Sequence, residues 1–155
     1  MNLSYIKKQL QFWADKKDVL HVKKLLTKED QILVKRKSEE LIQNIFTFDK
    51  PWDMERCQIP YKLETLDWNI QLNDDEEWCF MLNRMDYLNY LVLSDHIEYA
   101  KTLILNWIEA HPTIQPEPST RTLDTGIRLM NFFEALPYQE DRSKTILIDR
   151  LLEYA

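Results

Sequence analysis

Apolar residues recur at intervals of three and four along most of this chain, which is the spacing of one face of an α-helix. The pattern is clearest between residues 76 and 93, where its apolar positions are Trp78, Met81, Leu82, Met85, Leu88 and Val92. A second stripe in this stretch consists of Phe80, Arg84, Tyr87 and Leu91, which predicts burial on two sides. Asn73, Asp74 and Asp75 supply an N-cap and negative charge, so we expect one helix from there to about Leu93.

Other stretches with the same spacing predict further helices over about 2–13, 27–44, 96–110, 123–136 and from Pro137 to the end of the chain. The stretch 20–26 is a weaker candidate for a short helix. Thr27 with Asp30, and Asp95 with Glu98, have the spacing of capping boxes at two of these helix starts. Only a short turn separates the helices 76–93 and 96–110, which predicts an antiparallel hairpin.

The helix over 123–136 is expected to pack through Leu123, Ile127, Met130 and Ala135. Gly126 lies inside it, where glycine costs about 1 kcal/mol relative to alanine. We therefore expect a neighbouring helix or a ligand to approach the backbone closely at Gly126.

The stretch 46–73 is irregular, contains two prolines and alternates aromatic with polar residues. Thr47–Asp49 and Tyr61–Leu63 are candidates for short extended pieces. Trp52, Tyr61 and Trp68 either anchor this loop to the core or form stacking surfaces beside a cleft. Both alternatives stay open, because a loop of this length in a compact domain is usually functional or tightly packed.

Composition strengthens the helical interpretation. Gly126 is the only glycine in 155 residues, so tight turns with positive φ are disfavoured and a β-rich fold is unexpected. The length suits one domain. We predict a single all-α domain over 1–155, with N-terminal helices in 1–45, an irregular arm in 46–73 and helical hairpins in 74–155.

Charge and reactive residues narrow the function. The net charge of −6 and the pI of about 5.1 argue against nucleic acid as the main partner. No signal peptide or membrane-spanning apolar run is evident, which favours a cytoplasmic protein. The three histidines and two cysteines lack metal-binding spacing, so no metal or other cofactor is expected. Cys57 and Cys79 are expected to be reduced, although the sequence leaves a disulfide between them open.

Three stretches in a fixed order resemble the N-terminal region of the heparinase II/III family of polysaccharide lyases. They are EEWCFMLNRMDYL (76–88), DHIEYAKTLILNWIEAHP (95–112) and RTLDTGIRLMNFFEAL (121–136). The matching positions are Glu77–Trp78, Leu82–Asn83–Arg84, Tyr87, Tyr99, Trp107–Ile108, Arg121, Gly126, Arg128 and Asn131. The resemblance covers about 46–136, and it departs from the family pattern at Thr120, where a Trp is frequent.

The resemblance implies an incomplete (α/α) toroid, followed in the family by a mostly antiparallel β-sandwich domain. The family reaction is β-elimination at a uronic acid, in which a base removes the C5 proton and the 4-O-glycosidic bond breaks. The family's Asn-Asn-His stretch is absent from this chain, so no catalytic residue is assigned. Because the last helical pattern is still periodic at Ala155, we expect the chain to be the first part of a longer lyase.

The residues that we expect to bind an acidic polysaccharide or oligosaccharide are Asn83, Arg84, Tyr87, Arg121, Arg128 and Asn131. Arginine binds carboxylate or sulfate through two parallel hydrogen bonds, and the amides add further donors. Structural alternatives stay open. Arg128 lies four residues after Asp124, which is the spacing of an intrahelical ion pair, and Arg84 can pair with Glu77 or Asp86 from a neighbouring turn or helix. Trp78 and Trp107 are either core residues or flat surfaces for a sugar.

Two rival functions are retained. One is a non-catalytic helical module that binds a protein through its aromatic-rich loop 46–73. The other is a helical glycoside hydrolase whose paired carboxylates come from residues 74–77, or from Asp124 and Glu134. The first set of carboxylates also has the character of a helix N-terminus.

Overall fold

The chain is almost entirely helical where the computed structural model describes it, at residues 2–16, 23–48, 59–60 and 62–154. The helices are α1 (Leu3–Lys16), α3 (Lys28–Ile42), α4 (Glu76–Arg84), α5 (Leu88–Leu93), α6 (Ile97–Ala110), α7 (Thr122–Ala135) and α8 (Asp141–Tyr154). Short 3-10 helices lie at Leu63–Thr65, Leu72–Asp74, Pro118–Thr120 and Leu136–Tyr138. The strands β1 (Ile45–Phe46) and β2 (Ile59–Pro60) form one antiparallel pair. The predicted all-α class is confirmed.

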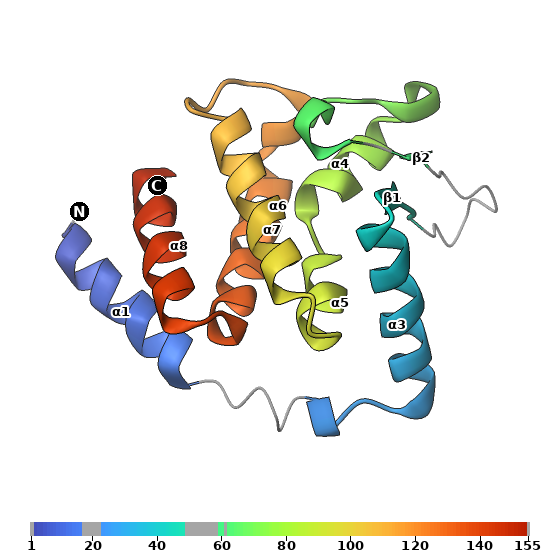
Figure 1. Cartoon of the computed structure of the whole chain (residues 1–155). Coiled ribbons are helices and arrows are strands. Elements are labelled where there is room, and N and C mark those ends of the chain that lie inside the picture. The colour runs from blue at the N-terminus through green and yellow to red at the C-terminus, as the bar shows by residue number, and fades with distance from the viewer. Residues whose placement is uncertain (1, 17–22, 49–58, 61, 155) are drawn as a thin grey trace.

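The helices are arranged around α6 and α7, which run through the middle of the molecule (Figure 1). On one side, α8 packs against α6, and α1 packs against α8. On the other side, α4 and α5 pack against α7, and α3 packs against α5. The core between these helices is built mainly from fully buried side chains, among them Trp78, Leu82, Leu88, Leu103, Trp107 and Phe132. Trp78 and Trp107 are therefore packing residues.

Several predicted elements are found close to their expected bounds. The capping box of Thr27 and Asp30 is present at the start of α3. In α6 the N-cap residue is His96 and no side chain caps the helix, so the predicted Asp95–Glu98 box was wrong. Trp68 anchors the irregular stretch, because its indole is 2% exposed and donates to Asn106 Oδ1 at 2.9 Å. Trp52, Tyr61 and Cys57 lie outside the described residues, and Cys79 is a buried free thiol.

The stretch predicted as one helix to Leu93 is instead two helices, α4 and α5, separated by residues 85–87. Met85 has left-handed backbone angles, φ 58° and ψ 34°, and ends α4. A residue other than glycine costs roughly 1–2 kcal/mol in this conformation. The periodicity of apolar residues continues through the break because the Met85 side chain is fully buried. The apolar spacing therefore predicts correctly that these residues are buried, but it predicts wrongly that they form one continuous helix.

The inward face of α7 also differs from the prediction. Leu123 is 61% exposed and Met130 is 66% exposed, while Ala135 is buried as expected. The other buried positions of α7 are Asp124, Arg128, Asn131 and Phe132. The helix thus turns three polar side chains toward its neighbours and two large apolar side chains toward solvent. Periodicity alone selected the wrong face, because hydrophobicity was taken as the mark of burial.

Gly126 lies on the exposed side of α7, and a Cβ atom placed there would have no neighbouring atom within 4 Å. The close approach expected at this position is therefore wrong for the described structure. In the described structure no close contact requires a glycine at position 126, so glycine there only lowers helix stability relative to alanine.

We expect Gly126→Ala to raise the free energy of unfolding by about 0.5–1 kcal/mol, because alanine restricts the unfolded chain and fits the helix without strain. Urea denaturation followed by circular dichroism measures the change. Leu123→Ala on the same exposed side is the matched control, and its effect should lie within about 0.5 kcal/mol of zero. A loss of stability in Gly126→Ala would mean that something does contact this face of α7.

Candidate functional site

The last turn of α4 is held by side chains from outside the helix. Tyr87 Oη donates to the Leu82 carbonyl at 2.8 Å, Arg128 Nη1 to the Asn83 carbonyl at 2.7 Å and Asn131 Nδ2 to the Arg84 carbonyl at 2.8 Å. The final carbonyls of a helix have no partner within the helix, so each of these bonds satisfies an otherwise unpaired acceptor. Tyr87, Arg128 and Asn131, three of the predicted ligand-binding residues, form the cap of α4.

Arg128 is the centre of this arrangement. It is fully buried, and Nη1 donates also to the Ser119 carbonyl at 3.1 Å, while Nη2 donates to Thr125 Oγ1 at 3.0 Å. Its guanidinium lies 3.7 Å above the Trp107 ring. Planar stacking and forked donors are properties of arginine that lysine lacks. The side chain therefore joins α4, α6, α7 and the turn before α7.

Asn83 connects the same region to the irregular loop. Its side chain is fully buried, and Nδ2 donates to the carbonyls of Trp68 and Cys79, each at 2.8 Å. Its Oδ1 accepts from Trp107 Nε1 at 2.9 Å. All the groups on this amide are thus engaged inside the protein. Asn83 is held where it positions Trp68, α4 and α6 relative to one another.

Asp124 is shared by two arginines at the surface end of the cluster. Its carboxylate is fully buried and accepts from Arg84 Nε at 2.7 Å and from Arg121 Nε and Nη2 at 2.5 and 2.9 Å. Burial alone would raise the pKa of Asp124, but the hydrogen bonds and charges of the two arginines outweigh it and lower the pKa. Arg84 also pairs with Glu77 at 3.2 Å, as one of the structural alternatives predicted.

Arg121 is the most accessible of the predicted residues, with a side chain that is 37% exposed. Its guanidinium lies 3.6 Å from the centre of the Phe80 ring, and Asp124 raises its pKa, so it stays charged. It lines a groove of about 610 Å³ between the start of α4 and the proline-containing loop before α7. Glu76 and Glu117 line the same groove, so the positive charge is local to Arg121.

A buried serine–histidine pair, Ser119 and His111, lies next to Trp107 and was missed in the sequence. His111 Nδ1 is 2.7 Å from the Trp107 carbonyl and Nε2 is 2.9 Å from Ser119 Oγ. The carbonyl can only accept, so Nδ1 carries the proton and Nε2 accepts from the serine. Ser119 is fully buried, which excludes it as a nucleophile for an external substrate in this arrangement. Ser119 follows His111 by eight residues, and this spacing alone did not single out the pair in the sequence.

The predicted residues therefore come together in space, but most lie below the surface. Asn83, Tyr87, Arg128 and Asn131 are buried, while Arg84 and Arg121 reach solvent in part. Burial raises the pKa of Tyr87 well above its ordinary value, so its hydroxyl remains a donor. The contacts observed for the buried residues are structural, and a direct role for any of the six with a ligand stays a prediction.

Comparisons with protein-family models, with curated proteins and with solved structures found no match to this chain. Within the described residues, no group of His, Cys, Asp and Glu side chains is arranged to hold a metal ion. The helices found in these same residues are all too short or too polar to cross a membrane.

We expect Arg128→Ala to lower the free energy of unfolding by about 3 kcal/mol or more, because it leaves buried carbonyls of Asn83 and Ser119 without this donor and opens a cavity beside Trp107. Arg142→Ala, at an exposed arginine of α8, is the control and should change stability by less than about 0.5 kcal/mol. Denaturant titration measures both. Equal effects of the two substitutions would contradict a structural role for Arg128.

The stability of the protein should fall in mild acid because of His111. Burial lowers its pKa from the ordinary 6.5, the hydrogen bond to Trp107 opposes this and nearby Arg128 adds to the lowering. The unfolded chain therefore takes up a proton near pH 6.5 that the folded protein resists. The contribution of His111 to the free energy of unfolding should be constant above that pH and decrease below it, by up to about 1.4 kcal/mol per pH unit.

Denaturant midpoints measured across this pH range test the prediction. His111→Gln should flatten the dependence, whereas His96→Gln, at the start of α6, should leave it intact. A slope that survives in His111→Gln would assign the acid sensitivity to another group.

Proposed function

We propose that the chain is the N-terminal part of a heparinase II/III-like polysaccharide lyase and forms one wall of the substrate cleft. In this proposal the described helices are a portion of an incomplete (α/α) toroid. The catalytic residues and the β-sandwich domain belong to a portion of the lyase that follows this chain. The substrate is a glycan that contains uronic acid.

One observation carries the proposal. The residues on which the resemblance rests come from separate stretches of sequence, yet Arg84, Arg121, Arg128 and Asn131 take part in one connected network between α4 and α7. Asp124 and the carbonyls of α4 connect them. An ordered pattern of polar residues that converges in this way is expected when the pattern describes a real structural unit.

Arg121 is the residue best suited to meet a ligand. Asp124 fixes its guanidinium through two hydrogen bonds and Phe80 supports one face. Its Nη1 has no hydrogen-bond partner among the described residues, so it can donate to a carboxylate or sulfate without breaking an existing bond. A pre-oriented donor loses little entropy on binding. The buried members of the network would hold this donor in place.

A second candidate, a protein-interaction module, is favoured by the outer side of α7. Leu123, Met130 and Gly126 are exposed there, and exposed apolar patches often mark protein contacts. The hydrolase alternative is weaker. Its candidate acid Asp124 is held in the charged form by two arginines, and Asp75 caps α4 by accepting from the Glu77 amide.

Calorimetric titration with uronate oligosaccharides prepared from heparan, hyaluronan and alginate tests the lyase proposal. Arg121→Gln should weaken binding by at least about tenfold, the effect of losing one charge-assisted hydrogen bond. Glu117→Gln should strengthen the binding, because it removes from the same groove a negative charge that repels the uronate. Both changes should become smaller at high salt, because ions screen the charges of the groove.

Absence of binding to every oligosaccharide, or equal affinity of Arg121→Gln and the unmodified chain, would contradict the proposal. In the first case the interaction module becomes the better explanation. Melting temperatures of both variants, recorded alongside, show whether a loss of binding reflects unfolding.

A further inference from the structure

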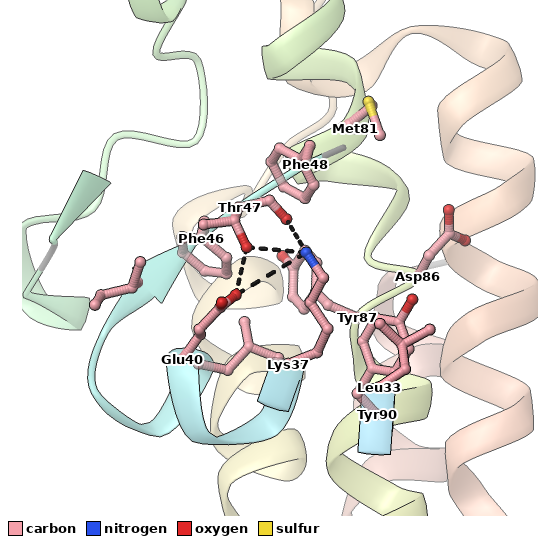
Figure 2. Close-up of a pocket in the computed structure, with 12 residues that line it drawn as sticks. Leu33, Lys37, Glu40, Phe46, Thr47, Phe48, Met81, Asp86, Tyr87 and Tyr90 are labelled. Carbon is pink, nitrogen blue, oxygen red and sulfur yellow. Dashed lines mark hydrogen bonds and ion pairs between the residues drawn. The ribbon is translucent and has the colours of Figure 1, made fainter. Parts of the chain in front are cut away.

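A second cavity, unrelated to the groove at Arg121, lies where α3 and the residues after β1 face the junction of α4 and α5 (Figure 2). Its volume is about 220 Å³. Much of its wall is apolar or aromatic, formed by Leu33, Phe48, Met81, Tyr87 and Tyr90. The rings of Phe48 and Tyr87 lie 6.2 Å apart in a tilted arrangement. Apolar walls with a few convergent polar groups are typical of small-molecule sites.

The polar groups of the cavity form a connected set on its α3 side. Lys37 is only 8% exposed, and Nζ donates to the Thr47 carbonyl at 3.3 Å and to Thr47 Oγ1 at 3.0 Å. Thr47 Oγ1 in turn donates to Glu40 Oε2 at 2.5 Å, and that oxygen lies 4.0 Å from Lys37 Nζ. Figure 2 shows the ammonium directed toward Thr47 and Glu40. Placing an ammonium at an apolar cavity is costly unless it is paired in this way.

A separate carboxylate completes the polar lining. Asp86 lies on the side of Tyr87 away from Glu40 and accepts from Asn131 Nδ2 at 2.7 Å. Among the described residues, the lining therefore contains the paired charges of Lys37 and Glu40 together with the carboxylate of Asp86, which is one more negative charge than positive. A ligand anion would face two carboxylates, while a ligand cation would face the ammonium. A neutral group that both donates and accepts avoids the cost of taking an ion out of water into a largely apolar cavity, and it can bond the groups that are already paired there.

We propose that this cavity binds a neutral ligand of one ring that carries a hydroxyl group. Its size supports a single ring, because a cavity of about 150 Å³ already accommodates benzene and this one is larger. The aromatic walls favour a flat ring through edge and offset contacts. The hydroxyl group would donate to Glu40 or Asp86 and accept from Lys37. The proposal is independent of polysaccharide binding at Arg121.

Phenol is the first probe, with toluene, benzoate and benzylammonium as probes of similar size that lack the hydroxyl or carry a charge. Each is titrated into the isotope-labelled full chain and followed by amide chemical shifts. Phenol should shift the signals of Lys37, Thr47 and Tyr87 with a Kd on the order of a millimolar, which suits a ligand of so few atoms. The two charged probes should bind at least about tenfold more weakly.

Three variants locate the site. Leu33→Phe places a ring in the cavity and should weaken phenol binding by at least about tenfold. Ile32→Phe, at the neighbouring α3 position that is 69% exposed, is the matched control and should leave phenol binding unchanged. Thr47→Val removes the hydroxyl that orders Lys37 and Glu40, so the preference for phenol over toluene should decrease while toluene binding persists.

The proposal is overturned if phenol shifts none of these signals at about ten times the expected Kd. It is also overturned if benzoate or benzylammonium binds as tightly as phenol, or if Leu33→Phe and Ile32→Phe have the same effect. Melting temperatures of the variants distinguish loss of the site from loss of the fold.

Discussion

The structure depends on how the end of α4 is stabilised. Met85 has a left-handed conformation that ends the helix. The backbone carbonyls of the last turn, which have no partner within the helix, then accept hydrogen bonds from side chains outside it. Arg128 is the most important of these, because its one guanidinium reaches both α4 and the turn before α7 while stacking on Trp107 of α6. Hydrogen bonds of this kind, made inside the protein, also explain why α7 presents polar residues to the core.

The sequence predicted the class of fold and most helices, because apolar spacing and capping residues such as Thr27 are local signals. It failed where a distant partner decides the outcome. The break at Met85 is made possible by Arg128 and Asn131, which lie more than forty residues away. Arg84, Arg121 and Arg128, which the sequence singled out, take part in one network, but the sequence could not distinguish a ligand-binding arginine from one that is fully buried.

The two proposed sites use different physical principles. At the groove, Arg121 offers a charged donor supported by Phe80, and its neighbouring carboxylates restrict the region of positive potential. At the cavity beside α3, Lys37 and Glu40 pair with each other, Asn131 holds the carboxylate of Asp86, and much of the remaining wall is apolar or aromatic. Asn131 Nδ2 bonds both the Arg84 carbonyl at the end of α4 and Asp86 in the cavity lining, so its amide links the end of α4 to the cavity.

The reversed polarity of α7 has a consequence for how this protein can change during evolution. At Asp124, Arg128 and Asn131 even a chemically similar residue loses a defined bond, so these positions should vary little among functional variants. Leu123 and Met130 contribute little to the interior, so other residues should be tolerated at these positions unless a partner covers them. A hydropathy profile would assign the opposite constraints, with the apolar positions fixed and the polar ones variable.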